Sequence, residues 1–122
     1  MARIDRDEER EERIKMEIVV DACNRDERAI GWYTSLADTI RFPFEARCIE
    51  EREVSPLEEG EEMHVSGMSS VEASQSEMFV TVDRMGRELG VPLAQLEPIQ
   101  VDSETEEPVA DWHYWAEREY EI

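Results

Sequence analysis

The hydrophobic periodicity of the chain changes from helical to strand-like at Phe42-Pro43. Upstream, apolar residues recur at helical spacing, whereas downstream Phe44, Ala46 and Cys48 alternate with charged residues. Helical spacing is typical of a helix packed on one face, and alternation is typical of a half-buried strand. Proline also pushes the residue before it out of the α region, so a helix is expected to end here. The chain is therefore predicted to contain a helical part followed by a β-rich part.

Two helices are predicted before this junction, forming a hairpin over about residues 5–41. In the first, Ile14, Ile18 and Ala22 form an apolar stripe behind an acidic first turn, which suits the helix dipole. Asp26 is a suitable N-cap for the second helix. The apolar face expected for this second helix consists of Ala29, Ile30, Tyr33, Leu36, Ala37 and Ile40. A single kinked helix is the alternative to the hairpin.

The β-rich part covers about residues 42–101, where short alternating segments are separated by turns. Residues 55–60 and 85–89 are turn-like, and residues 69–76 are small and polar. Four or five short strands in this arrangement predict a small antiparallel barrel or a strongly bent sheet. The segment 92–96, before the last strand, is similar to the short helical turn of SH3-like barrels. We therefore expect an SH3-like β-barrel or a bent sheet.

A third helix is predicted over about residues 104–120. Glutamates fill its first turn, and Pro108 lies early enough in the helix to be tolerated. Its apolar face consists of Val109, Trp112, Ala116 and Tyr120. Together these elements predict an α+β fold with an N-terminal helical hairpin, a β-rich middle and a C-terminal helix. The length fits a single domain over residues 1–122.

The charge of the chain restricts its partners. The sequence contains 13 basic and 32 acidic residues, which gives a formal net charge of −19. Such a surface repels nucleic acid and anionic membranes, and it attracts cations and basic proteins. No apolar run approaches the roughly 20 residues that span a bilayer, and the N-terminus resembles no signal peptide, so we expect a cytoplasmic protein. The alternative interpretation is that the acidity only keeps the protein soluble.

No catalytic arrangement is recognisable in the sequence. His64 and His113 have no nucleophile context, and the GxSxG, HExxH and P-loop motifs are absent. Zinc sites need paired cysteines or histidines at short spacing, which do not occur here. Cys23 and Cys48 are interpreted as reduced, small core residues. We therefore expect a protein that is not an enzyme.

A site for a hard cation fits the sequence better. Calcium takes about six to eight oxygen ligands from carboxylates, carbonyls and water. No EF-hand loop is present: read from Asp21, two ligand positions are occupied by Cys23 and Arg25. Read from Asp102, Glu107 stands where the sharp turn needs glycine. Any calcium site must therefore be assembled from segments that lie apart in the sequence.

Asp38 is the most informative carboxylate, because it is predicted to lie near the C-terminal end of the second helix. The helix dipole disfavours an anion there, and the last carbonyl oxygens of a helix have no intrahelical donor. Asp38 and these carbonyls would form half of a cation site. The alternative is an i,i+3 ion pair with Arg41, which stabilises a helix by only about 0.2–0.5 kcal/mol. The seven glutamates within residues 50–62 form either a solvated hairpin end or a loose cation-attracting rim.

Four segments occur in an order and spacing that one known family shares. They are GWYTSLADTIRFPFEARC at 31–48, SEMFVTVDR at 76–84, GVPLAQLEPI at 90–99 and DWHYW at 111–115. On these segments the chain resembles the CcbP-like calcium-binding proteins, best known from cyanobacteria, which are small, acidic and without EF-hands. The resemblance implies Asp38 as a principal ligand. It also points to Glu77 and Asp111 at acidic motif positions, and to Glu61 and Glu62 in an acidic turn.

We therefore predict a calcium-binding protein without EF-hands, acting as a cytoplasmic Ca²⁺ buffer or sensor through an acidic pocket. Its ligands are calcium ions, its expected state is a monomer, and a basic protein is the macromolecular partner to test for. Neither nucleic acid nor membrane is expected to bind. No Met-rich groove of the kind that calcium sensors expose is recognisable, which favours a buffer. The alternative is an acidic interaction module with an SH3-like barrel that binds a basic partner.

Overall fold

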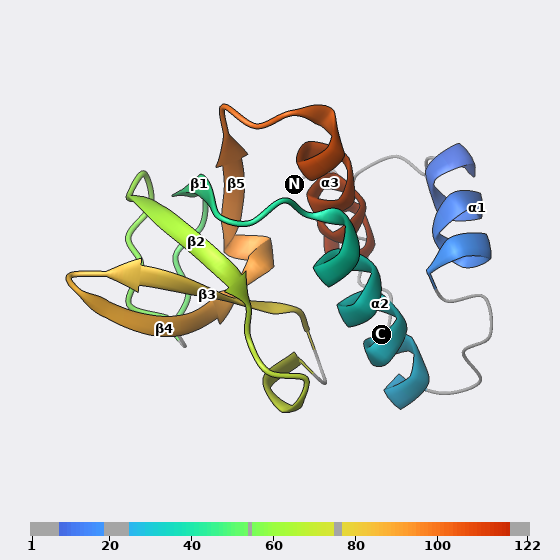
Figure 1. Ribbon diagram of the computed structural model, residues 1–122, viewed down its shortest axis with the longest axis horizontal. Coiled ribbons are helices and arrows are strands. Elements are labelled where there is room, and N and C mark those ends of the chain that lie inside the picture. The colour runs from blue at the N-terminus through green and yellow to red at the C-terminus, as the bar shows by residue number, and fades with distance from the viewer. Residues whose placement is uncertain (1–7, 19–24, 54, 75–76, 118–122) are drawn as a thin grey trace.

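The computed structural model describes residues 8–18, 25–53, 55–74 and 77–117 (Figure 1). Along the chain the elements are α1 (Glu8–Glu17), α2 (Arg25–Thr39), β1 (Phe44–Cys48), β2 (Glu62–Met68), η1 (Glu72–Ser74), β3 (Phe79–Arg84), β4 (Arg87–Pro92), η2 (Leu93–Gln95), β5 (Leu96–Ile99) and α3 (Ser103–Glu117). The three helices and the antiparallel sheet confirm the α+β class. No helix in the described ranges is both long and apolar enough to cross a membrane.

The predicted helices are present, with boundaries close to those expected. α2 ends at Thr39, shortly before Phe42-Pro43, as the proline rule requires. The third predicted helix is found as α3. Some sequence predictions fall outside the described part of the chain: those for Ala22, Cys23, Tyr120, the side chain of Asp26 and the connection between the first two helices.

The buried face of α2 differs from the predicted one. Trp32, which the predicted face omits, is completely buried, whereas Ile30 is 54% exposed and Ala37 is also exposed. The cause lies in α3, because the ring of Trp32 packs edge-on against Trp112, with 5.0 Å between the ring centroids. Helical spacing alone is compatible with burial of several neighbouring faces of α2. The contact with Trp112 on α3 determines which of these faces is buried.

The five strands form an open antiparallel sheet in the order β4-β3-β2-β1-β5. The expected alternation is confirmed in β1, where Phe44, Ala46 and Cys48 point into the core. Within the described chain, the two edge strands do not pair with each other, so the predicted SH3-like barrel is not confirmed. Each edge strand contains a proline, Pro92 in β4 and Pro98 in β5, which lacks an N–H for a further ladder bond.

The turn predicted over residues 85–89 is shorter in the structure. Only Met85 and Gly86 form it, with φ angles of 55° and 77°, and the residues after them already belong to β4. Two consecutive positive φ angles are the geometry of a two-residue hairpin turn, which glycine favours. The helical turn predicted at residues 92–96 is present as η2 between β4 and β5. The last two strands are therefore β4 and β5, joined by this turn.

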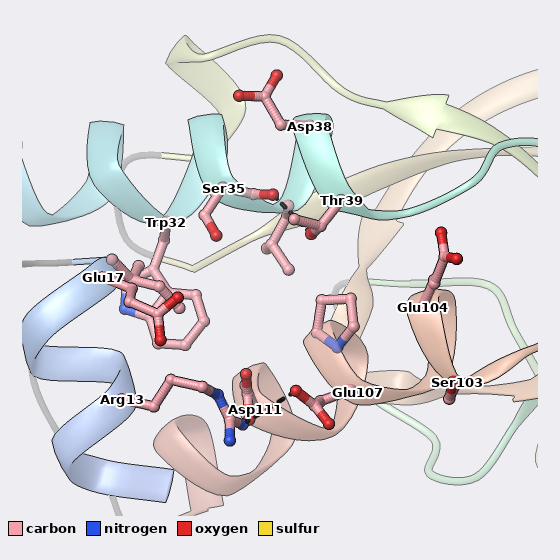
Figure 2. Close-up of a pocket in the computed structure, with 13 residues that line it drawn as sticks. Arg13, Glu17, Trp32, Ser35, Asp38, Thr39, Ser103, Glu104, Glu107 and Asp111 are labelled. Atoms are coloured by element: carbon pink, nitrogen blue, oxygen red, sulfur yellow. Dashed lines mark hydrogen bonds and ion pairs between the residues drawn. The ribbon is translucent and has the colours of Figure 1, made fainter.

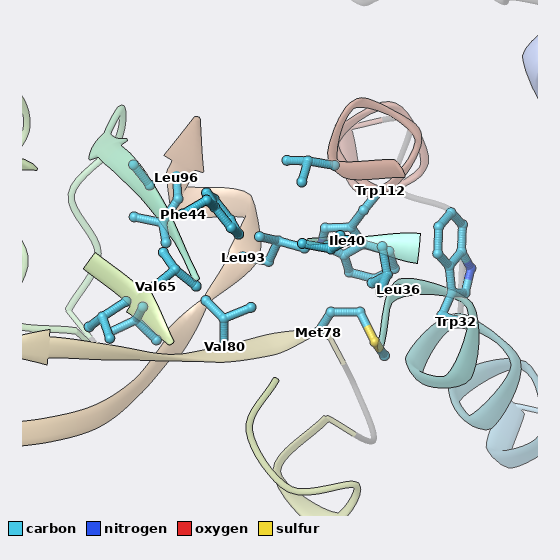
Figure 3. Close-up of a cluster of buried hydrophobic side chains, with 14 of the residues drawn as sticks. Trp32, Leu36, Ile40, Phe44, Val65, Met78, Val80, Leu93, Leu96 and Trp112 are labelled. Carbon is cyan, nitrogen blue, oxygen red and sulfur yellow. The ribbon is translucent and has the colours of Figure 1, made fainter. Parts of the chain in front are cut away.

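One buried hydrophobic cluster joins α2 and α3 to the sheet (Figure 3). Leu36 of α2 and Ile40, directly after this helix, lie beside Trp112 of α3, and the sheet contributes Val65 and Val80. Burial of several large apolar side chains is the main stabilising contribution to such a fold. Because these residues anchor the end of α2, they also fix the position of the polar groups at its C-terminus.

Candidate metal centre

A pocket of about 500 Å³ lies between α1, α2 and α3 (Figure 2). We call it the interhelical pocket. Its charged lining residues are Arg13, Glu17, Asp38, Glu104, Glu107 and Asp111. Five of these six side chains are carboxylates, so the pocket attracts cations.

Asp38 lies in the last turn of α2, at the rim of this pocket. Figure 2 shows its carboxylate pointing away from the carboxylates of α3. Arg41, the alternative partner, donates instead from Nε to Oε2 of Glu104 at 2.8 Å. The last turn of α2 contains no basic residue, and within the described chain the Asp38 carboxylate forms no ion pair. A negative charge therefore stands uncompensated at the negative end of a helix.

The main chain at the end of α2 supplies further oxygen atoms. The N–H of Ile40 donates to the carbonyl of Leu36 at 3.0 Å, which continues the helix by one bond. The next donor, the N–H of Arg41, bonds to Oγ1 of Thr105 at 3.0 Å instead of to a helix carbonyl. The carbonyls at positions 37–39 therefore receive no backbone hydrogen bond from the part of the chain that the structure describes. These are carbonyls of the kind that the sequence predicts beside Asp38.

The structure does not bring all five predicted ligands together. Glu61 and Glu77 each pair with an arginine on the β-rich side of the molecule, Glu61 with Arg84 at 2.7 Å and Glu77 with Arg52 at 2.8 Å. The Arg84 guanidinium lowers the pKa of the Glu61 carboxyl. Glu62 lies exposed at the start of β2. Of the five predicted ligands, only Asp38 and Asp111 line the interhelical pocket.

Asp111 is buried and joins α1 to α3. Its side chain is 6% exposed, and its Oδ1 accepts hydrogen bonds from both Arg10 and Arg13. Burial raises the pKa of the Asp111 carboxyl, and the two guanidinium groups partly offset this effect. A second hydrogen bond joins the same two helices: the hydroxyl of Tyr114 on α3 donates to Glu11 on α1 at 2.8 Å. Asp111 as a calcium ligand stays a prediction, but its Oδ1 already has two cationic partners.

Three carboxylates that line the pocket were not among the ligands predicted from the sequence: Glu17, Glu104 and Glu107. Glu104, Glu107 and Asp111 follow each other at intervals of three and four residues, which places them on one face of a helix. That spacing is visible in the sequence and could have identified the two glutamates. Glu17 could not have been found this way, because its place depends on how α1 packs against the other helices.

The donor atoms of the pocket suit calcium by type. Carboxylates, the hydroxyls of Ser35 and Thr39 and the free main-chain carbonyls are all hard oxygen ligands, as calcium prefers and zinc does not. In the described ranges, no three acidic, histidine or cysteine side chains stand close enough to hold a metal ion as they are. Glu104 and Glu107 are 61% and 59% exposed, so their side chains can turn toward an ion if Glu104 gives up its pair with Arg41 and Glu107 moves away from Arg13. Calcium would therefore gather its ligands on binding, with water completing the shell.

His113 lies elsewhere on α3 and is expected to make the fold sensitive to acid. Burial lowers its pKa, and the carbonyls of Leu96 and Leu93 partly offset that effect. A histidine with a lowered pKa is neutral in the folded protein but becomes charged on unfolding below about pH 6.5. We expect its contribution to the free energy of unfolding to be complete above that pH and to disappear as the pH falls through its folded-state pKa.

Urea unfolding of the wild type and of His113→Gln between pH 5 and 8 tests this expectation. The wild-type curve should fall more steeply below about pH 6.5, by up to about 1.4 kcal/mol per pH unit, the limit for one proton. The variant should lack this part of the slope whatever its stability at neutral pH. Parallel curves for the two proteins would contradict the assignment.

Comparison with known proteins places the chain among calcium-binding proteins. A protein-family model described as calcium binding, the CcbP calcium-binding model, matches residues 12–116. The crystal structure of Anabaena CcbP is 39% identical and superimposes with a TM-score of 0.87, covering 100% of both chains. A structure of a calcium-binding protein in the calcium-binding form is 38% identical, with a TM-score of 0.82 and the same coverage. Among curated proteins, none matches.

Proposed function

Because this chain belongs to the CcbP family of calcium-binding proteins, we propose that it binds Ca²⁺ at the C-terminal end of α2, on the rim of the interhelical pocket. The position of Asp38 is the observation that supports this site most. An exposed carboxylate at the negative end of a helix dipole, without an ion-pair partner in the described chain, is unfavourable by itself. A bound cation would reverse the sign of that interaction.

The proposed ligands come from two sides of the pocket rim. The free carbonyls at the end of α2 hold the ion from one side, together with the Asp38 carboxylate once this exposed side chain has turned toward α3. Glu104 and Glu107 reach it from α3, and water completes the coordination. Calcium contributes positive charge that neutralises these carboxylates. Glu61, Glu62 and Glu77 then belong to weaker, delocalised binding on the β-rich side, because they lie outside the interhelical pocket and each already has an arginine partner.

We propose a cytoplasmic buffer that acts as a monomer and has no catalytic role. Calcium sensors bind their targets through a large apolar groove that the ion exposes. In the described chain the large exposed hydrophobic side chains are scattered over several elements: Met16, Ile30, Ile49, Val71 and Met85. Their separation supports buffering, in which a charged surface takes up ions without a docking step.

Calorimetric titration of calcium into the wild type and into Asp38→Asn tests this proposal. The substitution preserves the shape of the side chain but removes its charge and one of its two ligand oxygens. We expect calcium affinity to fall by about tenfold or more, since a direct ligand interacts with a divalent ion at the shortest distance. Magnesium should bind the wild type much more weakly than calcium, because it requires near-octahedral geometry.

Glu88→Gln is the matched control for this titration. Glu88 is an exposed carboxylate on β4, an edge strand of the sheet, and its loss changes the net charge by the same amount. This control should bind calcium within about twofold of the wild type, because salt screens distant surface charges. Equal affinities for Asp38→Asn and Glu88→Gln would refute Asp38 as a ligand. A wild type that binds no calcium would refute the function and favour the acidic interaction module.

A further inference from the structure

The interhelical pocket contains a cation of its own. Arg13 of α1 is the single basic side chain among the pocket-lining residues that the structure describes. Its Nη2 bonds to Oδ1 of Asp111 and lies 3.7 Å from Oε1 of Glu107. Figure 2 shows the Arg13 side chain extending from α1 toward these two carboxylates. A guanidinium group therefore already occupies part of the space in which carboxylates would hold a metal ion.

The packing of α1 keeps Arg13 in this place. The next residue, Ile14, is completely buried in the hydrophobic core. One turn earlier, Arg10 bonds to the same oxygen of Asp111, but Arg10 does not line the pocket. Because α1 is fixed at these points, the Arg13 side chain cannot leave the neighbourhood of Glu107 without losing contacts. The Arg13 guanidinium is therefore a positive charge held in the pocket by the chain, whereas a solvent cation would exchange freely.

We infer that Arg13 is an internal competitor of calcium and sets the affinity of the site. This inference rests on the proposed function and adds to it the residue that limits binding. When calcium reaches Glu107, the guanidinium must give up that carboxylate while keeping its bond to Asp111. The wild-type site therefore binds calcium less tightly than its carboxylates alone would allow, which suits a buffer that must also release the ion.

The size of this effect follows from Coulomb's law. A unit charge about 6 Å from a divalent cation, in a medium close to water, weakens binding about tenfold. Screening by salt reduces the effect of more distant charges, since the Debye length is about 10 Å at 0.1 M. Removing Arg13 should therefore tighten calcium binding far more than removing a basic residue that contacts none of the proposed ligands.

Calorimetric titration of calcium into Arg13→Gln tests the inference, with Arg10→Gln as the matched control. Both variants lose one charge from the same helix and one hydrogen bond to the same oxygen of Asp111. Arg13→Gln should bind calcium about tenfold more tightly than the wild type, and Arg10→Gln about twofold or less. Arg13→Lys, which keeps the charge, should stay close to the wild type. If Arg13→Gln binds no more tightly than Arg10→Gln, Arg13 is not a competitor.

A measurement on the wild type keeps the inference testable if Arg13→Gln does not fold. The Nε–H signal of Arg13 in a nitrogen-correlated NMR spectrum should shift as calcium is added and saturate with the calorimetric isotherm. The signal of exposed Arg87 on β4 should remain unchanged. An unmoved Arg13 signal in a protein that binds calcium overturns the inference alone. A wild type that takes up no calcium overturns the proposed function together with it.

Discussion

Replacing Trp32 by alanine is expected to lower the free energy of unfolding by about 3–5 kcal/mol, as measured for large aromatic side chains in protein cores. Trp32 is completely buried in α2. Its ring lies 5.0 Å from that of Trp112 and 5.8 Å from that of Trp115, which joins all three tryptophans of the chain. The truncation therefore removes a large apolar surface and two aromatic contacts at once.

Urea unfolding followed by far-UV circular dichroism measures this loss. Ile30→Ala is the matched control, because Ile30 lies on the same helix but is 54% exposed. It should change stability by no more than about 0.5 kcal/mol. Trp32→Phe keeps part of the ring and serves as a milder variant if the alanine protein does not fold. A loss below about 1 kcal/mol for Trp32→Ala would contradict the packing of α2 on α3.

The second large effect is expected for Asp111→Ala, which should cost about 3 kcal/mol. Removing one partner of a buried ion pair leaves the other charges without compensation. Here the carboxylate is 6% exposed and serves two arginines of α1, so its loss also releases the polar attachment of that helix. The loss of stability is smaller than for a fully buried pair, because both guanidinium groups are partly exposed and remain solvated.

Glu104→Ala is the comparison for this measurement, made without calcium. Glu104 lies on the same helix and forms an ion pair with Arg41, but it is 61% exposed. Exposed ion pairs contribute about 0–1 kcal/mol, so this variant should remain within that range of the wild type. Hydrogen exchange should show that Asp111→Ala weakens the protection of α1 in particular. Equal stability of the two variants would mean that Asp111 does not attach α1.

The fold was predictable to the extent that local patterns determine it. The change of periodicity at Phe42-Pro43, the alternation in β1 and the helical turn between the last two strands are all local, and the structure confirms them. Whether the sheet closes into a barrel was not predictable, because closure depends on pairing between strands distant in sequence. The buried face of α2 was misjudged for a similar reason, since Trp112 on another helix decides it.

In the candidate site, too, the local features were predictable from the sequence and the long-range contacts were not. Asp38 was recognisable because a helix end is a local feature, and its uncompensated position is consistent with that prediction. Glu104 and Glu107 were recognisable from their helical spacing with Asp111, although they were not predicted as ligands. Arg13 was not recognisable at all, because nothing in its neighbourhood in the sequence indicates contact with residues about a hundred positions away.

The sequence by itself determined the class of the fold, the strong attraction for cations and the family, because periodicity, net charge and motif order are properties of the chain alone. The tertiary structure alone decided which carboxylates share a pocket and which are neutralised by arginines. Electrostatic interactions fall with distance in space and not along the chain. Only the packing of α1 and α2 on α3 brings Asp38, Glu107 and Arg13 to the same pocket. The affinity of the site therefore depends on how the helices pack.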